Sequence, residues 1–414
     1  MKTISARTQP VNVPQSNHHV ALIPGFLGFS KLADFSYFAD TVGAAIVEAL
    51  AKRVPERRVS VHAFETVPAG SLRERQAALI KQLKTVRAQY PQAQLHLVGH
   101  STGGLDAELL LRTAQAGAPY DDETQDIRRA IRSVTTIASP LAGTSLARSP
   151  LARFFAIDSL RDVLEAPFDL LLFQGPSALL GGLSRVLALF LDDASARAIS
   201  DALLHSGNAG VSYVLSLVLQ RALISELAPD KVEKLLNATS EDGTLPAIRR
   251  ARFVTIARRE AQPTAASLLF RYLYDNTARE ASADPDVMLA VHALQQRAER
   301  PDFPIIGVLP LPKLDIHAND GIVDTARQIF ASTGSTIARE VQHVEALVVA
   351  DHIDVVGYFP GKDGHDNGFL SSGSNFRTPQ LEQLYAAVAD VIAEALEEVP
   401  TRDGQPRPQR TEVS

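Results

Sequence analysis

Short apolar runs alternate with amphipathic segments through the first third of the chain. The segments with the apolar or alternating pattern of β-strands are 19–24 (HVALIP), 58–64 (RVSVHAF), 95–98 (LHLV) and 133–138 (SVTTIA). The segments between them that space apolar residues as a helix does are 41–53, 71–88 and 105–112. The order β-α-β-α-β-α-β predicts an α/β protein with a mostly parallel central sheet flanked by helices.

The hydrophobic pattern changes in the middle of the chain. From about residue 141 to 245 no strand is indicated, and leucine-rich segments follow helical periodicity. The strand pattern returns at 252–257 (RFVTIA), and residues 380–397 form a last amphipathic segment. We therefore expect an α/β core made of 19–148 and 251–397, with 149–250 inserted as a large helical cap or lid. Residues 1–18 are expected to be a polar, mobile lead-in, and 398–414 a disordered tail.

Composition narrows the function classes. The chain has 414 residues, of which 45% are hydrophobic and 21% charged, which is ordinary for a globular protein. A net charge of −6 gives no reason to expect a nucleic-acid partner. The chain contains no cysteine, which excludes disulfides, thiolate metal sites and a cysteine nucleophile. There is no apolar stretch of signal-peptide or membrane-spanning length, so a cytoplasmic location is expected.

A serine stands between two glycines directly after a predicted strand. Gly99-His100-Ser101-Thr102-Gly103 matches the G-x-S-x-G pattern, with LHLV before it and a predicted helix after it. In such a turn the neighbours two positions from the serine carry no bulky side chain, so its hydroxyl is exposed near the N-terminus of the next helix. Backbone N–H groups and the helix dipole favour negative charge there. The alternative is an ordinary strand–turn–helix connection.

The segment VGHSTGGLD resembles the nucleophile elbow of α/β-hydrolase-fold lipases and esterases. HHVALIPGFLGFS resembles their oxyanion loop, with Pro24 where that family usually has histidine. VTTIASPLAGTSLA resembles the strand and loop that follow the elbow helix. NDGIVD and DHIDVV resemble the acid and histidine segments of bacterial triacylglycerol lipases. The resemblance covers about 20–147 and 251–359, whereas the helical block between them is similar only in kind.

This resemblance implies a catalytic triad. Ser101 would be the nucleophile, His352 the general base and then general acid, and Asp320 the group that orients the imidazole. The order Ser, Asp, His along the chain is the order of this fold. The backbone N–H groups of Phe26 and Thr102 would form the oxyanion hole.

Other residues compete for these roles. Asn319-Asp320-Gly321 is also a turn signal, and Asp315 and Asp324 lie nearby. The competing histidines are His317, His343 and His365. His352 is favoured because it follows the strand-like run ALVV.

The only metal suggested by the sequence is calcium. Asp354 matches a calcium-binding aspartate of some bacterial lipases, and its alternative role is an exposed or helix-capping acid. No clean second ligand is found, and no H-E-x-x-H pattern points to a catalytic metal. No other cofactor is expected.

The predicted function is a serine carboxylic-ester hydrolase that cleaves medium- to long-chain acyl esters through an acyl-enzyme. A phospholipase, thioesterase, polyester depolymerase or acyltransferase would have the same motifs, and a non-catalytic lipid-binding protein is the alternative outside enzymes. The expected partner is an acyl ester or lipid. The helical cap would line an acyl pocket, contact a lipid surface, or serve only as core helices. Its candidate pocket residues are Phe154, Phe155, Phe168 and 171–173.

Overall fold

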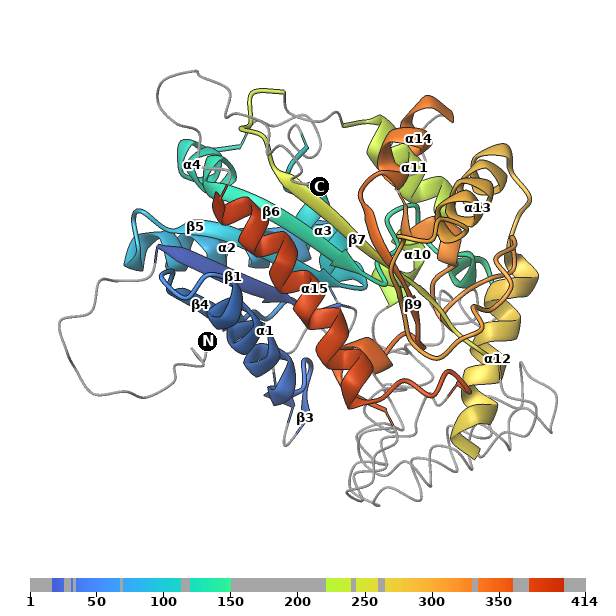
Figure 1. The fold of residues 1–414 in the computed structure, drawn as a ribbon. Coiled ribbons are helices and arrows are strands. Elements are labelled where there is room, and N and C mark those ends of the chain that lie inside the picture. Colours follow the sequence, from blue (N-terminus) through green and yellow to red (C-terminus); the bar gives the residue numbers. More distant parts are fainter. Residues whose placement is uncertain are drawn as a thin grey trace, which may run out of the picture.

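Seven parallel strands form the central sheet of the computed structural model (Figure 1). Across the sheet the strands are β4 (Val59–Ala63), β1 (His18–Ile23), β5 (Gln94–His100), β6 (Ile131–Ile137), β7 (Arg249–Ile256), β9 (Val344–Val349) and β8 (Ile305–Ile306). Every neighbouring pair is parallel. A separate antiparallel pair joins β2 (Lys31–Leu32) and β3 (Phe35–Ser36). The predicted α/β fold with a parallel sheet is confirmed.

The structure describes only part of the chain. The described residues are 17–25, 31–32, 35–67, 70–112, 120–149, 221–239, 243–259, 265–329, 334–359 and 372–397. The predicted disordered tail, most of the predicted lead-in and residues 150–220 of the predicted cap lie outside these ranges, as do the candidate pocket residues. None of the helices in the described ranges is long and apolar enough to cross a membrane.

Helices cover both faces of the sheet (Figure 1). One face packs against α1 (Asp40–Arg53) and α15 (Thr378–Glu397). The helices packed on the other face are α2 (Leu72–Gln89), α3 (Thr102–Leu109), α4 (Asp122–Ala130), α13 (Pro285–Ala298) and α14 (Gly334–Val341). The remaining α-helices described are α10 (Arg221–Glu226), α11 (Pro229–Asn237) and α12 (Ala265–Glu280).

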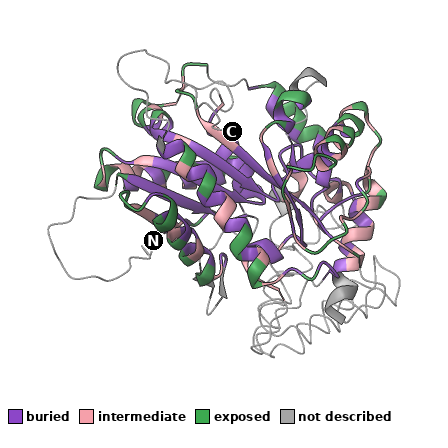
Figure 2. Cartoon of the chain, in the orientation of Figure 1, coloured by how far each residue is buried: buried purple, intermediate pink, exposed green. Residues whose placement is uncertain are grey.

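Burial on both faces explains why the strands read as short apolar runs. All six residues of β1 are buried, and the central strands are buried along almost their whole length (Figure 2). Successive strand residues point to opposite faces, so Val20 and Leu22 join the core under α1 and α15, while Ala21 and Ile23 join the core under α2 and α3.

Two strands of the sheet begin inside segments that were expected to lie outside the α/β core. Strand β1 begins at His18, inside the expected lead-in, and β7 begins at Arg249, inside the expected cap. Both first residues are polar, and hydrophobicity alone does not reveal that a strand extends over them. Within the described part of the predicted cap, Val232 and Leu236 of α11 belong to one hydrophobic cluster with Leu105 of α3. This part of the insertion is therefore packed on the α/β core.

Candidate active site

The turn after β5 holds Ser101 in a strained conformation. Its φ of 54° and ψ of −132° are values that residues other than glycine rarely adopt. The turn is so tight that a Cβ on Gly99 would overlap the backbone of Gly103 and Gly104. A Cβ on Gly103 would lie 2.7 Å from the Pro24 carbonyl oxygen. The glycines of the motif are thus required by close backbone approach, and the predicted elbow is present.

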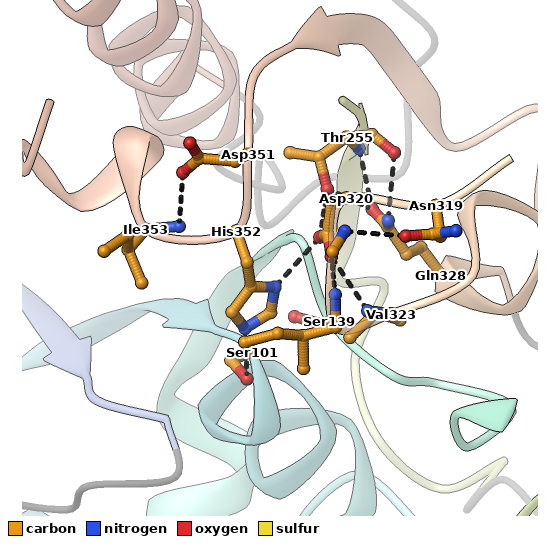
Figure 3. A network of polar contacts seen from close by, with 12 residues as sticks. Ser101, Ser139, Thr255, Asn319, Asp320, Val323, Gln328, Asp351, His352 and Ile353 are labelled. Carbon is orange, nitrogen blue, oxygen red and sulfur yellow. Dashed lines mark hydrogen bonds and ion pairs between the residues drawn. The ribbon is translucent and has the colours of Figure 1, made fainter. Parts of the chain in front are cut away.

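The structure brings Ser101, His352 and Asp320 together (Figure 3). His352 Nε2 lies 2.9 Å from Ser101 Oγ, and His352 Nδ1 lies 2.9 Å from Asp320 Oδ2. All three side chains are buried, the most exposed at 5%. Because a carboxylate only accepts, Nδ1 carries the hydrogen, which leaves Nε2 able to accept the serine proton. This is the arrangement of a nucleophile, its base and an orienting acid.

The Asp320 carboxylate is fixed by its own set of donors. Thr255, near the end of β7, donates its hydroxyl to Asp320 Oδ2 at 2.6 Å. The other oxygen, Oδ1, accepts from the backbone N–H groups of Ile322 at 3.0 Å and Val323 at 2.8 Å. The His352 N–H also donates to the Asp320 carbonyl at 3.0 Å. Acid and base are therefore tied together through both side chain and backbone.

His100, the residue before the nucleophile, is also part of the network. Its Nε2 lies 2.8 Å from the His352 carbonyl oxygen, and its Nδ1 lies 2.7 Å from the Tyr37 hydroxyl. The ring centroids of His100 and His352 are 4.8 Å apart. Burial, and then the neighbouring His352 ring, lower the pKa of His100 well below its usual value. His100 is accordingly a neutral imidazole.

A buried arginine supports the turn beside the nucleophile. Arg75 of α2 is fully buried and donates to the carbonyl oxygens of Pro24 at 2.9 Å and Gly25 at 3.0 Å. It also forms an ion pair with Asp106 of α3, at 2.6 Å. Gly25 lies directly against the nucleophile, since a Cβ there would be 2.6 Å from Ser101 Cβ. The first turn after β1 is thus held next to Ser101 by α2.

Only one of the two predicted oxyanion donors lies in the described part of the chain. Thr102 is the first residue of α3, where backbone N–H groups have no partner within the helix. It directly follows Ser101 and is buried. Phe26 lies outside the described residues, although its neighbour Gly25 is placed against Ser101. The assignment of Phe26 stays a prediction.

The competing residues lie in other surroundings. Asp324 accepts the N–H of Ser145 at 2.7 Å, and Asp315 pairs with Lys313 at 3.0 Å. His317 bonds to the Ala278 carbonyl, and His343 follows α14, before β9. His365 lies outside the described residues. None of the described rivals replaces a member of the triad.

Asp354 is buried rather than exposed. Its Oδ2 accepts the Asp351 N–H at 3.1 Å. Burial raises the pKa of Asp351 to about 7, and it raises the pKa of Asp354 well above its usual value. The carboxyl group of Asp351 is also close enough to raise the pKa of Asp354 by charge repulsion. A calcium ion takes six to eight oxygen ligands. No group of three or more acidic or histidine side chains suited to a metal occurs among the described residues, so calcium binding stays a prediction.

Comparison with known proteins finds similar solved structures but no relative by sequence. No protein-family model matches the sequence, and no curated protein matches it. The lipase of Staphylococcus hyicus is 15% identical with a TM-score of 0.50, and the alignment covers 96% of this chain and 100% of that one. The chain has the α/β-hydrolase fold.

Further solved structures similar to this α/β-hydrolase chain have lower TM-scores. EstA from Clostridium botulinum is 15% identical with a TM-score of 0.44, covering 93% of this chain and 89% of that one. Lipase 1 from Pelosinus fermentans is 14% identical with a TM-score of 0.44, and the alignment covers 92% of this chain and 99% of that one.

Sequence patterns alone missed several polar residues of the site: Tyr37, Arg75, His100 and Thr255. Each contacts the site through a partner that is distant along the chain, and no short motif records such a pairing. One signal was available. Arg75 lies on the predicted helix 71–88, where a charge that is placed toward the sheet must have a buried partner.

Proposed function

We propose that this protein is a serine carboxylic-ester hydrolase that works through an acyl-enzyme. The observation that carries the proposal is the hydrogen-bonded series from Ser101 through His352 to Asp320, with the serine on a strained elbow at the carboxyl ends of the strands. A serine hydroxyl is a weak nucleophile at neutral pH, and it needs a base within hydrogen-bond reach. His352 Nε2 meets this need at 2.9 Å.

Acylation begins when Ser101 Oγ attacks the ester carbonyl carbon and its proton passes to His352 Nε2. The negative charge on the carbonyl oxygen develops beside the N-terminus of α3, where the Thr102 N–H and the helix dipole favour it. The imidazolium formed on His352 is stabilised by Asp320 at Nδ1. The C–O bond of the tetrahedral intermediate then breaks, and the leaving alcohol takes the proton from Nε2.

Deacylation repeats these steps with water. His352 accepts a proton from a water molecule, which attacks the acyl carbon, and the carboxylic acid leaves as Ser101 recovers its proton. Phe26 is proposed as the second oxyanion donor, because the preceding residue Gly25 lies against Ser101. Losing one such donor typically lowers the rate about 100- to 1000-fold.

For the substrate, we propose esters of medium- to long-chain fatty acids. The leucine-rich sequence of 149–250, which predicts an apolar cap, supports this choice, because an apolar cap would suit the binding of an acyl chain. The described end of this insertion shares a hydrophobic cluster with α3, the helix that follows the nucleophile. Contact with a lipid surface through the same insertion is part of this proposal.

The test is hydrolysis of p-nitrophenyl esters from acetyl to palmitoyl by the wild type and by Ser101→Ala. We expect turnover to fall at least about 1000-fold in the variant, because the attacking atom is gone. A p-nitrophenyl phosphonate should add one phosphonyl group to the Ser101 peptide of the wild type and none to the variant, as read by mass spectrometry. A wild type that is inert on every chain length and is not labelled would contradict the proposal.

A further inference from the structure

We propose that Tyr37 and His100 act as positioning residues, forming a polar bridge that holds the His352 main chain and the Gly25 peptide in register with Ser101. The bridge consists of the Tyr37 hydroxyl and the His100 imidazole, which are 2.7 Å apart, and both side chains are buried. It deepens the proposed function, on which it rests. Neither residue contacts the proton that passes between Ser101 and His352.

The direction of each hydrogen bond follows from the groups involved. The His352 carbonyl oxygen only accepts, so His100 Nε2 carries a hydrogen and donates to it at 2.8 Å. In a neutral imidazole the other nitrogen then has no hydrogen, so Nδ1 accepts the Tyr37 hydroxyl proton. The lowered pKa of His100, caused first by its burial, agrees with this neutral form. The His352 carbonyl therefore sets which nitrogen of His100 donates, and Tyr37 supplies the donor that the other nitrogen needs.

The other end of the bridge reaches the turn beside the nucleophile. Gly25 lies against the Tyr37 hydroxyl, since a Cβ on Gly25 would overlap its oxygen, and this oxygen still has a lone pair that can accept the Gly25 backbone N–H. Gly25 is the residue that lies against Ser101 Cβ, and its carbonyl is held by Arg75. The donors run in one direction, from Gly25 through Tyr37 and His100 to His352, so each bond polarises the next.

The bridge completes the support of the catalytic histidine. The His352 N–H donates to the Asp320 carbonyl, its Nδ1 faces the Asp320 carboxylate, and its carbonyl is held by His100. The ring is thus fixed from its side chain and from both sides of its backbone. A neutral partner suits this place, because a positive charge 4.8 Å from the His352 ring would oppose the imidazolium formed during catalysis.

The experiment compares Tyr37→Phe, His100→Leu and His100→Gln. Tyr37→Phe removes one hydroxyl and keeps the ring. His100→Leu removes both hydrogen bonds of His100, the one with Tyr37 and the one with the His352 carbonyl. Glutamine keeps an amide N–H at the reach of Nε2, so it can still donate to the His352 carbonyl. For each variant we would measure kcat and KM on the p-nitrophenyl ester that the wild type cleaves best, the rate of Ser101 phosphonylation, and Tm.

Matched controls separate positioning from general loosening of the core. His96 lies on the same strand and the same face as His100, is fully buried, and bonds to Ser133 instead of the site. Tyr385 is a fully buried tyrosine whose hydroxyl donates to the Val355 carbonyl at 2.8 Å instead of to a histidine. His96→Leu and Tyr385→Phe should lower Tm as the test variants do, and they should keep kcat within about twofold.

We expect Tyr37→Phe and His100→Leu to lower kcat and the phosphonylation rate about 10- to 100-fold with KM within about twofold, because a small displacement of the base is costly. His100→Gln should keep more activity than His100→Leu. The double variant Tyr37→Phe/His100→Leu should lose no more than His100→Leu alone, since both substitutions break one bridge.

Two failures can be told apart. If the wild type neither hydrolyses esters nor is labelled at Ser101, the proposed function fails. If the wild type is active and labelled, but Tyr37→Phe and His100→Leu lose no more activity than the two controls, the bridge is only structural and the inference is overturned. Tyr37→Phe removes a single oxygen atom, so it keeps the test decisive if His100→Leu does not fold.

Discussion

At the scale of single residues, Asp320 shows how fully the site constrains a side chain. Its carboxylate accepts hydrogen bonds from Thr255, His352 and two backbone N–H groups, so each of its two oxygens has two donors. A carboxylate in this place holds one tautomer of the imidazole, the one whose Nε2 can accept the serine proton. Asparagine has the same shape, but its amide N–H group would offer His352 Nδ1 a donor in place of an acceptor.

We therefore predict that Asp320→Asn lowers kcat on the order of 10⁴-fold while the fold is kept. The reason is the imidazole tautomer, since an asparagine N–H facing Nδ1 would move the histidine hydrogen to Nε2. The measurement is kcat on the best p-nitrophenyl ester, with circular dichroism as the check on folding. Asp315→Asn is the control, because Asp315 pairs with Lys313 away from the triad, and it should keep kcat within about twofold. Equal losses in the two variants would contradict the assignment of Asp320.

The residues predictable from sequence were those with a local signature. Ser101 stands in a motif whose glycines are required by backbone contacts within the turn, and His352 follows a buried strand. Tyr37 and His100 are 63 positions apart, and His100 and His352 are 252 apart. A hydrogen bond across such a separation depends on the folded sheet, and nothing in one sequence encodes the pairing locally.

At the scale of elements, the nucleophile turn depends on how closely β5 approaches the start of α3. A Cβ on Gly99 would meet the backbone of Gly103 and Gly104, which cannot move away as the tip of a side chain can. Alanine at this position would force the strand and helix apart and displace Ser101. Gly243 offers the opposite case, because nothing lies within 4 Å of a Cβ built there.

The prediction is that Gly99→Ala abolishes turnover or prevents folding, whereas Gly243→Ala keeps full activity. At Gly243 alanine reduces the freedom of the unfolded chain, and the gain in stability is of order 0.4–1 kcal/mol if the backbone is compatible. The measurements are kcat and the midpoint of urea unfolding for each variant. An active, normally stable Gly99→Ala protein would show that the turn is looser than the contacts indicate.

Helices α2 and α3 are joined by the buried pair of Arg75 and Asp106. Both side chains are fully buried, and Arg75 also holds the Pro24 and Gly25 carbonyls. Removing one member of a buried pair leaves the other charge without its partner, at a cost of about 3–5 kcal/mol. We predict that Arg75→Met loses unfolding free energy of this order.

Adding Asp106→Leu to Arg75→Met should recover part of the loss, because the unpaired carboxylate is removed. Urea unfolding of the two single variants and the double variant measures this coupling. Ester hydrolysis of the double variant should stay well below the wild type, since the carbonyls of the turn beside Ser101 have still lost their donor. A double variant less stable than Arg75→Met would contradict this account of the pair.

Elements with strong apolar patterns were predicted within a few residues, such as helix 71–88 for Leu72–Gln89 and strand 95–98 inside Gln94–His100. Strand β8 was missed because it has only two residues, too few to show an alternation. Helices α12 and α13 were not predicted either. A helical insertion was expected over 149–250, but only the folded structure reveals that α11 shares a hydrophobic cluster with α3.

At the scale of the whole molecule, the opposite end of the sheet carries two buried histidine pairs. His18 Nδ1 lies 3.3 Å from His96 Nε2, and His19 Nδ1 lies 2.8 Å from His62 Nε2. Each pair crosses between neighbouring strands. Burial lowers the pKa of His18 and His62 to about 4 and that of His96 to about 3. His18, His62 and His96 are therefore neutral in the native protein at neutral pH.

Their effect on stability has a definite sign. In the unfolded chain a histidine titrates near pH 6.5, so between about pH 6.5 and 4 the unfolded state binds more protons than the native state. The unfolding free energy that depends on these histidines is therefore complete above pH 6.5 and is lost as the pH falls through this window. Asp351 acts in the opposite sense, because burial raises its pKa to about 7 and the native state then binds the extra proton.

Because the two effects oppose each other, the wild-type pH profile alone cannot separate them, and variants are needed. His96→Gln should gain stability relative to the wild type as the pH is lowered from 7 to 5, since its side chain no longer takes up a proton on unfolding. Asp351→Asn should gain relative to the wild type as the pH is raised from 5 to 7. Urea unfolding at each pH measures both differences. If the difference in unfolding free energy between a variant and the wild type stays constant with pH, the residue titrates alike in the native and unfolded states. It would then contribute nothing to the pH dependence of stability.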